Sequence, residues 1–343
     1  MKNAKRNDAS TMLSQAMATF VAKRALPVVL ALLMALFATF ALYACSGGGQ
    51  ASRVSAPVSA KDAVNDYSWS ELSSISSEIA AAGSDEAALA VAKRYHLANE
   101  DGTLDGSQYK EVELESGLKT RVLVAGFNHD ATPGGGKAGI SFVFADAVAL
   151  RGMNNNGGFD ETSIPDDFDV IGGWNASELR GWLNGDFASE LPADLQAALA
   201  DVVKRSLVVP AREQELDDTG TLLSSVDSLV GEGTDRLWIP ALAEVSGVKD
   251  NSPTAKESPE WTAPLKAEGS QYQLFHDAVV SERSANGVLV RALAGGDGAA
   301  CRWWLRSAED WTYAQVLADG FIDRRDDTPT APTPQGVVPC FAI

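Results

Sequence analysis

The stretch CRWWLRS, residues 301 to 307, sets two tryptophans side by side between two arginines. Its aromatic and aliphatic composition favours a β-strand, in which successive side chains point to opposite faces. We expect the side chains on one face to pack in the core, and these are Cys301, Trp303, Leu305 and Ser307. The other predicted face carries an indole between two guanidinium groups: Arg302, Trp304 and Arg306.

The arginine face has two possible roles. It is a candidate surface for a sugar, a peptide aromatic residue or a carboxylate-bearing ligand, because indoles stack and guanidinium groups bind planar acceptors. Three residues of an upstream helix are expected to join this surface: Trp174, Arg180 and Trp182. Alternatively, the arginines pair with Glu309, Asp310 or other carboxylates, and Trp304 packs inside the domain. The sequence leaves both roles open.

The cysteine at the start of the stretch predicts a crosslink. Cys301 and Cys340 lie in the same C-terminal region of a chain that also carries an export signal. Disulfides form in oxidising compartments outside the cytoplasm. We therefore expect a Cys301–Cys340 disulfide that ties the CRWWLRS strand to the closing GVVPCFAI segment. Two free, buried cysteines are the alternative.

The first 60 residues indicate export. Lys23 and Arg24 precede an uncharged run from Ala25 to Ala44, which ends at Cys45. A basic segment, an apolar segment and a small residue before a cysteine resemble a bacterial lipoprotein signal. We expect residues 1–45 to be the signal, Cys45 to be lipidated and residues 46–60, rich in Gly, Ser and Ala, to be a flexible tether. An uncleaved membrane anchor is the alternative, and either predicts an extracytoplasmic protein attached to the membrane.

The bulk composition excludes several functions. The 343 residues are 45% hydrophobic and carry a net charge of −18 at pH 7. Such a surface repels phosphate backbones, so we expect no nucleic-acid partner. The sequence lacks established metal-ligand and hydrolase motifs, and we expect no metal, no cofactor and no catalytic residue.

The order of elements predicts an α+β fold of short mixed and antiparallel strands with several helices, forming one domain over residues 61–343. Residues 61–100 are expected to form a helical hairpin, with Ser84 capping its second helix. Asn175 is expected to cap the next helix and Gly185 to end it. A further helix is expected over residues 191–205 and a long loop over residues 250–269.

The motifs GGWNASELRGWLN, DRLWIP, WWLRS and GVVPCFAI occur in that order from about Tyr67 to the C-terminus. This order resembles a family of bacterial cell-surface domains that is known only as a domain of unknown function. The resemblance brings no activity and no catalytic residues. The layout is also distantly similar to C-type lectin-like folds, without their calcium and sugar motif.

Three functions follow as hypotheses. The first is a non-catalytic binding module, tethered at the cell surface, for a carbohydrate or peptide. The second is an envelope hydrolase that uses an aspartate, a glutamate or His129. The third is a purely structural envelope lipoprotein. A pocket that gathers Trp304, Arg306 and Trp182 would favour the first function, and paired carboxylates with His129 in a cleft would favour the second.

Overall fold

The computed structural model describes residues 58–154, 170, 172–208, 225–253, 256, 259–309, 312–323 and 331–343. The chain divides into two units, Met1–Ala56 and Pro57–Ile343, and the described residues all belong to the second unit. The predicted signal segment 1–45, Cys45 and most of the 46–60 tether lie outside the described residues. Within the described residues, no helix has the length and apolar character needed to cross a membrane.

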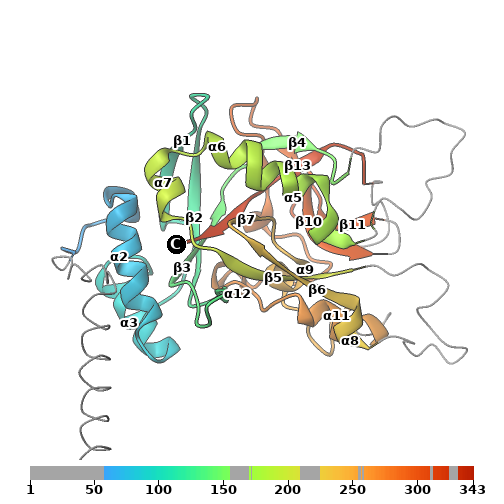
Figure 1. Cartoon of the computed structure of the whole chain (residues 1–343), viewed down its shortest axis with the longest axis horizontal. Coiled ribbons are helices and arrows are strands. Elements are labelled where there is room, and N and C mark those ends of the chain that lie inside the picture. The colour runs from blue at the N-terminus through green and yellow to red at the C-terminus, as the bar shows by residue number, and fades with distance from the viewer. Residues whose placement is uncertain are drawn as a thin grey trace, which may run out of the picture. The chain divides into compact units, whose positions relative to one another are not determined.

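The expected α+β class is confirmed, and the first of two five-stranded sheets is antiparallel throughout (Figure 1). Its strands run in the order β1-β2-β3-β14-β7. They comprise Tyr109–Glu113 (β1), Lys119–Phe127 (β2), Ile140–Phe144 (β3), Cys340–Ala342 (β14) and Leu237–Trp238 (β7). The C-terminal strand thus lies near the centre of the sheet, hydrogen-bonded to both β3 and β7. Strand β1 forms one edge.

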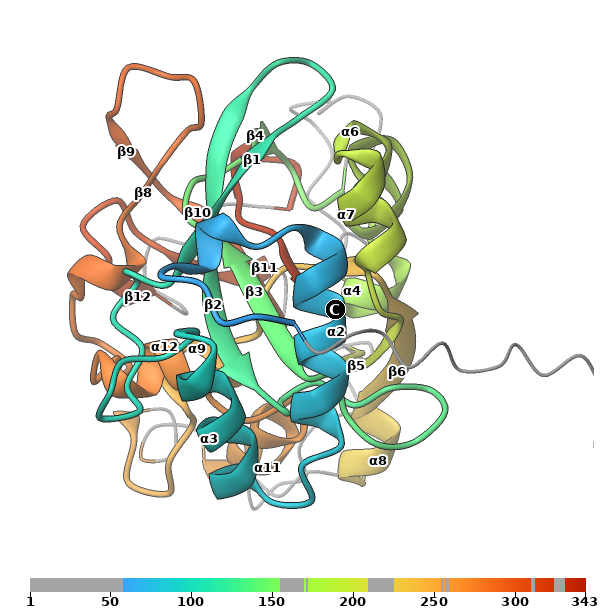
Figure 2. The ribbon, with the colours of Figure 1, turned by 90° about the vertical axis from the view of Figure 1, so that its left-hand side faces the viewer.

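A helical hairpin covers this sheet, as the sequence predicted (Figure 2). It consists of α2 (Trp69–Ala80) and α3 (Asp85–Arg94), and Ser84 accepts the Ala87 N–H as the expected cap. At the start of α2, Ser68 and Glu71 form a capping box, which satisfies backbone N–H groups that a helix start leaves unpaired. Trp69 packs edge-on against two phenylalanines of β3 and β14, Phe142 and Phe341.

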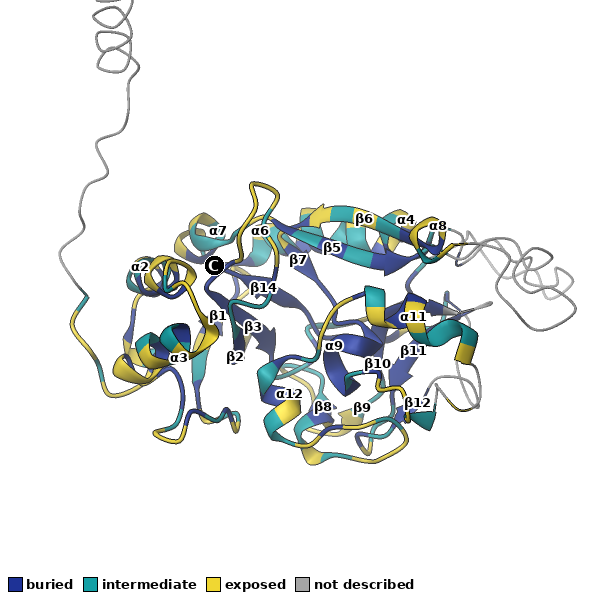
Figure 3. Cartoon of the chain, turned by 90° about the horizontal axis from the view of Figure 1, so that it is seen from below, coloured by how far each residue is buried: buried dark blue, intermediate teal, exposed yellow. Residues whose placement is uncertain are grey.

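The second sheet carries the CRWWLRS stretch. Its strands run in the order β12-β11-β10-β13-β4. They comprise Ile322–Asp323 (β12), Thr312–Val316 (β11), Trp303–Glu309 (β10), Gln335–Val337 (β13) and Ala149–Arg151 (β4). Strand β10 is therefore central, antiparallel to β11 and parallel to β13. Figure 3 shows β10 and β11 buried, which is the arrangement expected of an inner strand rather than a surface one.

The GGWNASELRGWLN segment folds differently from the prediction. It forms α4 (Gly173–Ala176) and α5 (Glu178–Trp182), followed by a π-helical turn η3 (Leu183–Phe187) and α6 (Ala188–Glu190). Ser177, not Asn175, caps α5. The helical backbone continues through Gly185 as η3, so the prediction that Gly185 ends the helix was wrong.

The paired glycines explain the start of that segment. Gly172 and Gly173 both have positive φ values, 83° and 55°, which glycine tolerates best. A Cβ on Gly173 would lie 1.8 Å from the Leu207 carbonyl oxygen. Only glycine therefore lets this turn approach the neighbouring strand β5 (Val202–Leu207) so closely.

Two further predictions were wrong. The helix expected over residues 191–205 ends early: α7 covers Ala193–Ala198, and β5 follows, paired with β6 (Val230–Asp235). The region 250–269, expected as a loop, contains α11 (Pro259–Ala267). The remaining elements are α8 (Val226–Leu229), α9 (Leu242–Ser246), α12 (Gln273–Asp277), the short 3₁₀ turns η1 (Val64–Asp66) and η5 (Gly287–Leu289), β8 (Arg291–Ala292) and β9 (Ala300–Cys301).

Candidate binding cleft

The expected surface position of Trp304 and Arg306 was wrong. Both side chains are fully buried, as are Trp303 and Leu305 on the predicted opposite face. The register between β10 and β11 shifts between Trp304 and Ala308, so simple alternation does not hold along this stretch. The surrounding elements cover both faces of the strand, and Arg306 must find its partners inside the protein.

Arg306 forms a two-pronged ion pair with Glu244 of α9. Its Nη1 and Nη2 donate to the two carboxylate oxygens, the second at 2.9 Å. The remaining guanidinium donors reach the Ser206 hydroxyl at 3.1 Å and the main-chain carbonyls of Ile239 and Glu268 at 3.1 and 2.9 Å. This is the alternative role that the sequence left open, an intramolecular ion pair, with Glu244 as the partner.

Lys204 of β5 extends the pair into a buried charge network. Its ammonium donates to Glu244 Oε1 at 2.7 Å and to Asp130 Oδ1. Tyr272 donates its hydroxyl to Asp130 at 3.1 Å. We call Asp130, Lys204, Glu244, Glu268 and Arg306 the buried charge network; each side chain is almost wholly buried.

Opposite charges keep two carboxylates of the network ionised. Burial by itself would raise the pKa of Asp130, but the adjacent Lys204 ammonium brings it well below its usual range. Burial likewise acts to raise the pKa of Glu244, and the Arg306 guanidinium overcomes this and lowers it. The network therefore joins β5, α9 and β10 by charge-assisted hydrogen bonds.

Glu268 behaves differently from the other two carboxylates. Burial raises its pKa to about 7, although Arg306 acts in the opposite direction. Its Oε1 accepts the Leu207 N–H at 3.1 Å, and its Oε2 accepts the Ser307 hydroxyl. This carboxyl thus changes its protonation near neutral pH inside the core.

The helix residues expected to join the surface site also have internal partners. Trp174 is fully buried and donates its indole N–H to Asp235 at 2.9 Å, and Arg180 pairs with the same carboxylate at 2.6 Å. Trp182 is half-buried beneath the Arg151 guanidinium, 4.5 Å from the ring centre.

Arg151 connects this helix to the CRWWLRS strand. Its main-chain carbonyl accepts the Trp304 indole N–H at 2.9 Å. Arg302 is half-buried and also engaged. The structure thus brings Trp182 and Trp304 to one neighbourhood, where the Arg151 contacts of both side chains are intramolecular.

The predicted disulfide is not formed. Cys301 and Cys340 are both free, the first half-buried and the second fully buried. Cys301 lies on β9, in the small β8–β9 hairpin, whereas Cys340 lies on β14 in the first five-stranded sheet. Two free cysteines are the alternative that the sequence left open, and the two strands belong to different sheets.

His129 lies at the edge of the buried charge network. Its ring packs on Tyr272, with centroids 4.0 Å apart, and its Nδ1 is 3.2 Å from Asp130 Oδ1. Its Nε2 is 2.9 Å from the Ser270 carbonyl oxygen. Both ring nitrogens thus have protein neighbours, and His129 does not line either of two clefts, of about 540 and 320 Å³, that described residues form elsewhere.

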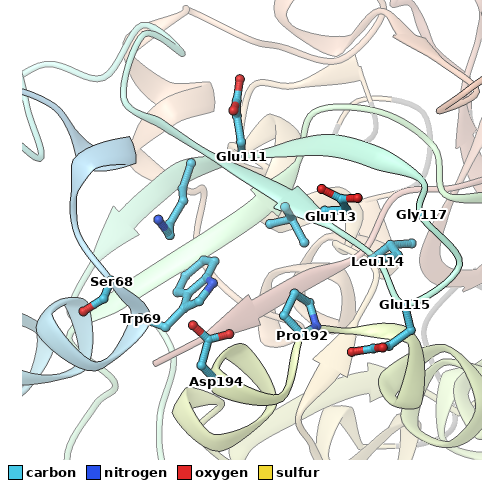
Figure 4. A pocket seen from close by; sticks show the side chains of 11 residues that line it. Ser68, Trp69, Glu111, Glu113, Leu114, Glu115, Gly117, Pro192 and Asp194 are labelled. Carbon is cyan, nitrogen blue, oxygen red and sulfur yellow. The ribbon is translucent and has the colours of Figure 1, made fainter.

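The larger of these clefts, about 540 Å³, lies where α2, β1 and α7 meet (Figure 4). The smaller one, about 320 Å³, lies beside His96, whose Nδ1 is already 2.6 Å from the Lys61 carbonyl oxygen. We call the larger one the β1 cleft. Its lining residues are Ser68, Trp69, Lys110, Glu111, Val112, Glu113, Leu114, Glu115, Gly117, Pro192 and Asp194.

Three side chains give the β1 cleft its polar character. Trp69 forms the floor and is only 3% exposed. Lys110 lies with its ammonium 5.4 Å from the Trp69 ring centre. Asp194, at the start of α7, is exposed, and Figure 4 shows its carboxylate turned toward the Trp69 indole. The cleft therefore offers a cation, an anion and an indole N–H within one open, solvent-facing hollow.

Sequence analysis did not identify these residues as a site. Trp69 lies within the predicted helical hairpin of residues 61–100, and Lys110 and Asp194 are charged residues in an acidic chain without a recognisable motif. The available signal was weak, namely a lysine on the same face of β1 as the buried Val112, where an apolar residue is expected. Within the described residues, no group of three or more His, Cys, Asp or Glu residues is suited to a metal ion.

Comparisons with known proteins give a family and no activity. No curated protein and no solved structure matches the chain. One family model matches residues 161–343, which include α4 to α7, the CRWWLRS strand and the C-terminus. The match contains Pro192 and Asp194 of the β1 cleft, while Trp69 and Lys110 precede it. Since more than half of the chain is matched, the protein belongs to the family described as domain of unknown function DUF6273.

Proposed function

We propose that this protein is a non-catalytic binding module, tethered outside the cytoplasm by a lipid on Cys45 or by an uncleaved N-terminal anchor. The ligand class is the one expected from the sequence, an extracellular carbohydrate or peptide. A C-type lectin-like arrangement of the family domain forms part of the proposal. The basic and apolar N-terminal segment, which ends at Cys45, supports the attachment.

The observation that carries the binding function is the β1 cleft. Ligand sites are concave and combine an apolar lining with a few convergent polar groups. The β1 cleft is concave, and Lys110 and Asp194 converge in it beside Val112, Leu114 and Pro192, with a lining that is more polar than apolar. The sequence suggested a site on the arginine face of β10. We instead place the candidate site at the edge of the first sheet.

The hydrolase alternative has less support. A general base must reach the substrate, within hydrogen-bond distance of the proton that it removes. The carboxylate nearest His129 is Asp130, which is buried and held by Lys204. The structural alternative makes a distinct prediction, because a purely structural lipoprotein would bind no ligand in the β1 cleft.

The binding function is tested on the purified full chain with glycan and peptide arrays. We expect the chain to bind either glycans or peptides on these arrays. We expect this binding to weaken when Asp194→Lys places a long cation in the cleft. Asp201→Lys, an exposed charge reversal outside the cleft, is the matched control. If the chain binds neither glycans nor peptides, the proposed function is contradicted. Mass spectrometry of the membrane fraction tests lipidation, and an unmodified Cys45 in a cleaved protein would contradict it.

A further inference from the structure

The hydrogen-bonding pattern of β1 shows which main-chain groups face the β1 cleft. In an antiparallel pair, alternate residues direct their N–H and C=O groups toward the partner strand. The Val124 N–H donates to the Gln108 carbonyl at 2.9 Å, and the Leu114 N–H donates to the Leu118 carbonyl at 2.8 Å. Even-numbered residues from 108 to 114 thus bond to β2, and the intervening odd-numbered residues face the free edge of the sheet.

Most of this free edge is already occupied. The Glu111 N–H donates to the Asn65 side chain at 2.8 Å, and the Glu115 N–H donates to the Glu190 carbonyl at 2.8 Å. Glu113, between them, has no such edge partner among the described residues and lines the cleft. A peptide that adds a strand needs several consecutive edge groups, so the blocked positions on either side disfavour peptide addition.

The cleft also presents two side-chain donors with unused capacity. The Trp69 indole N–H has no hydrogen-bond partner among the described residues, although the ring is 97% buried. Figure 4 shows the nitrogen edge of this ring on the side facing Asp194 and Pro192. Lys110 donates to the Asn65 and Tyr67 carbonyls at 3.3 and 2.5 Å, which leaves one of its three ammonium protons available.

Acceptors lie beside these donors. One oxygen of Asp194 accepts the Leu195 N–H at 3.0 Å, and the other remains open. The Glu113 carbonyl faces the same edge as its N–H. The cleft thus alternates donors (Trp69, Lys110 and the Glu113 N–H) with acceptors (Asp194 and the Glu113 carbonyl), and hydroxyl groups, which both donate and accept, match this pattern.

Resting on the proposed binding function, we infer that the β1 cleft binds a neutral saccharide unit through the Trp69 N–H, the Lys110 ammonium, the Asp194 carboxylate and the main chain of Glu113. Asp194 and the glutamates at the rim oppose an acidic sugar. Lys110 at the floor opposes a cationic ligand. Because the Trp69 face is buried, the saccharide is held by its hydroxyl groups rather than by stacking on the ring.

The test measures binding of soluble neutral oligosaccharides, built from glucose, galactose, mannose or N-acetylglucosamine, to the purified full chain by titration calorimetry. The variants are Trp69→Phe, which removes the N–H and keeps an aromatic ring, Lys110→Met and Asp194→Asn. Lys137→Met, at an exposed lysine that does not line the cleft, is the matched control. We expect each cleft variant to weaken binding about tenfold or more and the control to leave it unchanged.

The outcomes separate the inference from the proposed function. Binding of peptides alone, weakened by the same variants, would overturn the saccharide inference and support the binding function. Saccharide binding that none of the cleft variants weakens would overturn the site. If the chain binds neither saccharides nor peptides, both the saccharide inference and the proposed binding function are overturned. Asp194 is exposed, so Asp194→Asn keeps the test decisive if Trp69→Phe proves unstable, and circular dichroism verifies the fold of each variant.

Discussion

A single buried residue, Arg306, connects three separate parts of the domain. Removing one partner of a buried ion pair leaves the other as an uncompensated charge, which costs about 3–5 kcal/mol. We therefore expect Arg306→Met to lower the free energy of unfolding by about that amount, because Glu244 then loses its two-pronged partner. Urea unfolding followed by circular dichroism measures the change.

An exposed pair provides the control for Arg306. Lys119 and Glu113 lie 3.3 Å apart with side chains 76% and 61% exposed, and such pairs contribute about 0–1 kcal/mol. Lys119→Met should therefore change stability little. In the double variant Arg306→Met with Glu244→Gln, part of the loss should return, because the unpaired charge is gone. Equal losses for Arg306→Met and Lys119→Met would show that the buried pair has no special energetic role.

Sequence patterns at the residue scale predicted the strand but not its environment. The composition of CRWWLRS correctly indicated β10, and an ion pair for Arg306 was one of the two roles considered. The partner, Glu244, is 62 positions away, and no local spacing identifies it. Alternation along the strand then gave the wrong exposure for Trp304, because it presupposes a regular sheet with one open face.

At the scale of elements, the close approach between the GGW turn and β5 gives a specific prediction. Gly173→Ala forces a positive φ on a residue with a Cβ and places that Cβ against the Leu207 carbonyl. We expect a loss of stability of at least about 1–3 kcal/mol. Gly181, inside α5, has open space around it, so Gly181→Ala should be neutral or stabilise by up to about 1 kcal/mol. Thermal unfolding compares the two variants, and similar melting temperatures would contradict the role assigned to Gly173.

Element type was predicted where the local pattern was strong and failed where tertiary pairing decided. The helical hairpin and its Ser84 cap follow from periodicity and capping alone. The run after Leu191 is equally periodic, yet it becomes a strand at Val202 because β6 pairs with it over six residues. Likewise, α11 forms in a proline-rich region that was expected to be a loop, and Pro264 lies inside it.

At the scale of the whole molecule, the class was predictable and the topology was not. Helices followed by strands indicated α+β, but nothing local places the C-terminal β14 between β3 and β7. The β1 cleft, too, depends on the topology and not on any local pattern. Trp69, Lys110 and Asp194 are 41 and 84 positions apart along the chain, and only the assembled sheet and helices bring them together.

The buried carboxyl of Glu268 gives the whole domain a pH dependence of defined sign. Its pKa is about 7 in the folded protein and 4.5 for an ordinary glutamate. The folded state therefore binds this proton more tightly, and the stabilisation is complete below pH 4.5 and lost as the pH rises through about 7. At about 1.36 kcal/mol per pH unit, the total loss is about 3 kcal/mol.

The Glu71 carboxyl titrates outside this window. The pKa of Glu71 is lowered to about 2, mainly by its hydrogen bond from Lys61, so its contribution is lost only in acid, below about pH 4.5. Urea unfolding between pH 5.5 and 8 should thus show stability falling with pH in the native chain and in Glu71→Gln. In Glu268→Gln the fall should disappear, because glutamine has no ionisable group; its carbonyl oxygen still accepts the Leu207 N–H, and its amide nitrogen donates to the Ser307 hydroxyl in place of the present bond. A decline that persists in Glu268→Gln would assign the titration to another group.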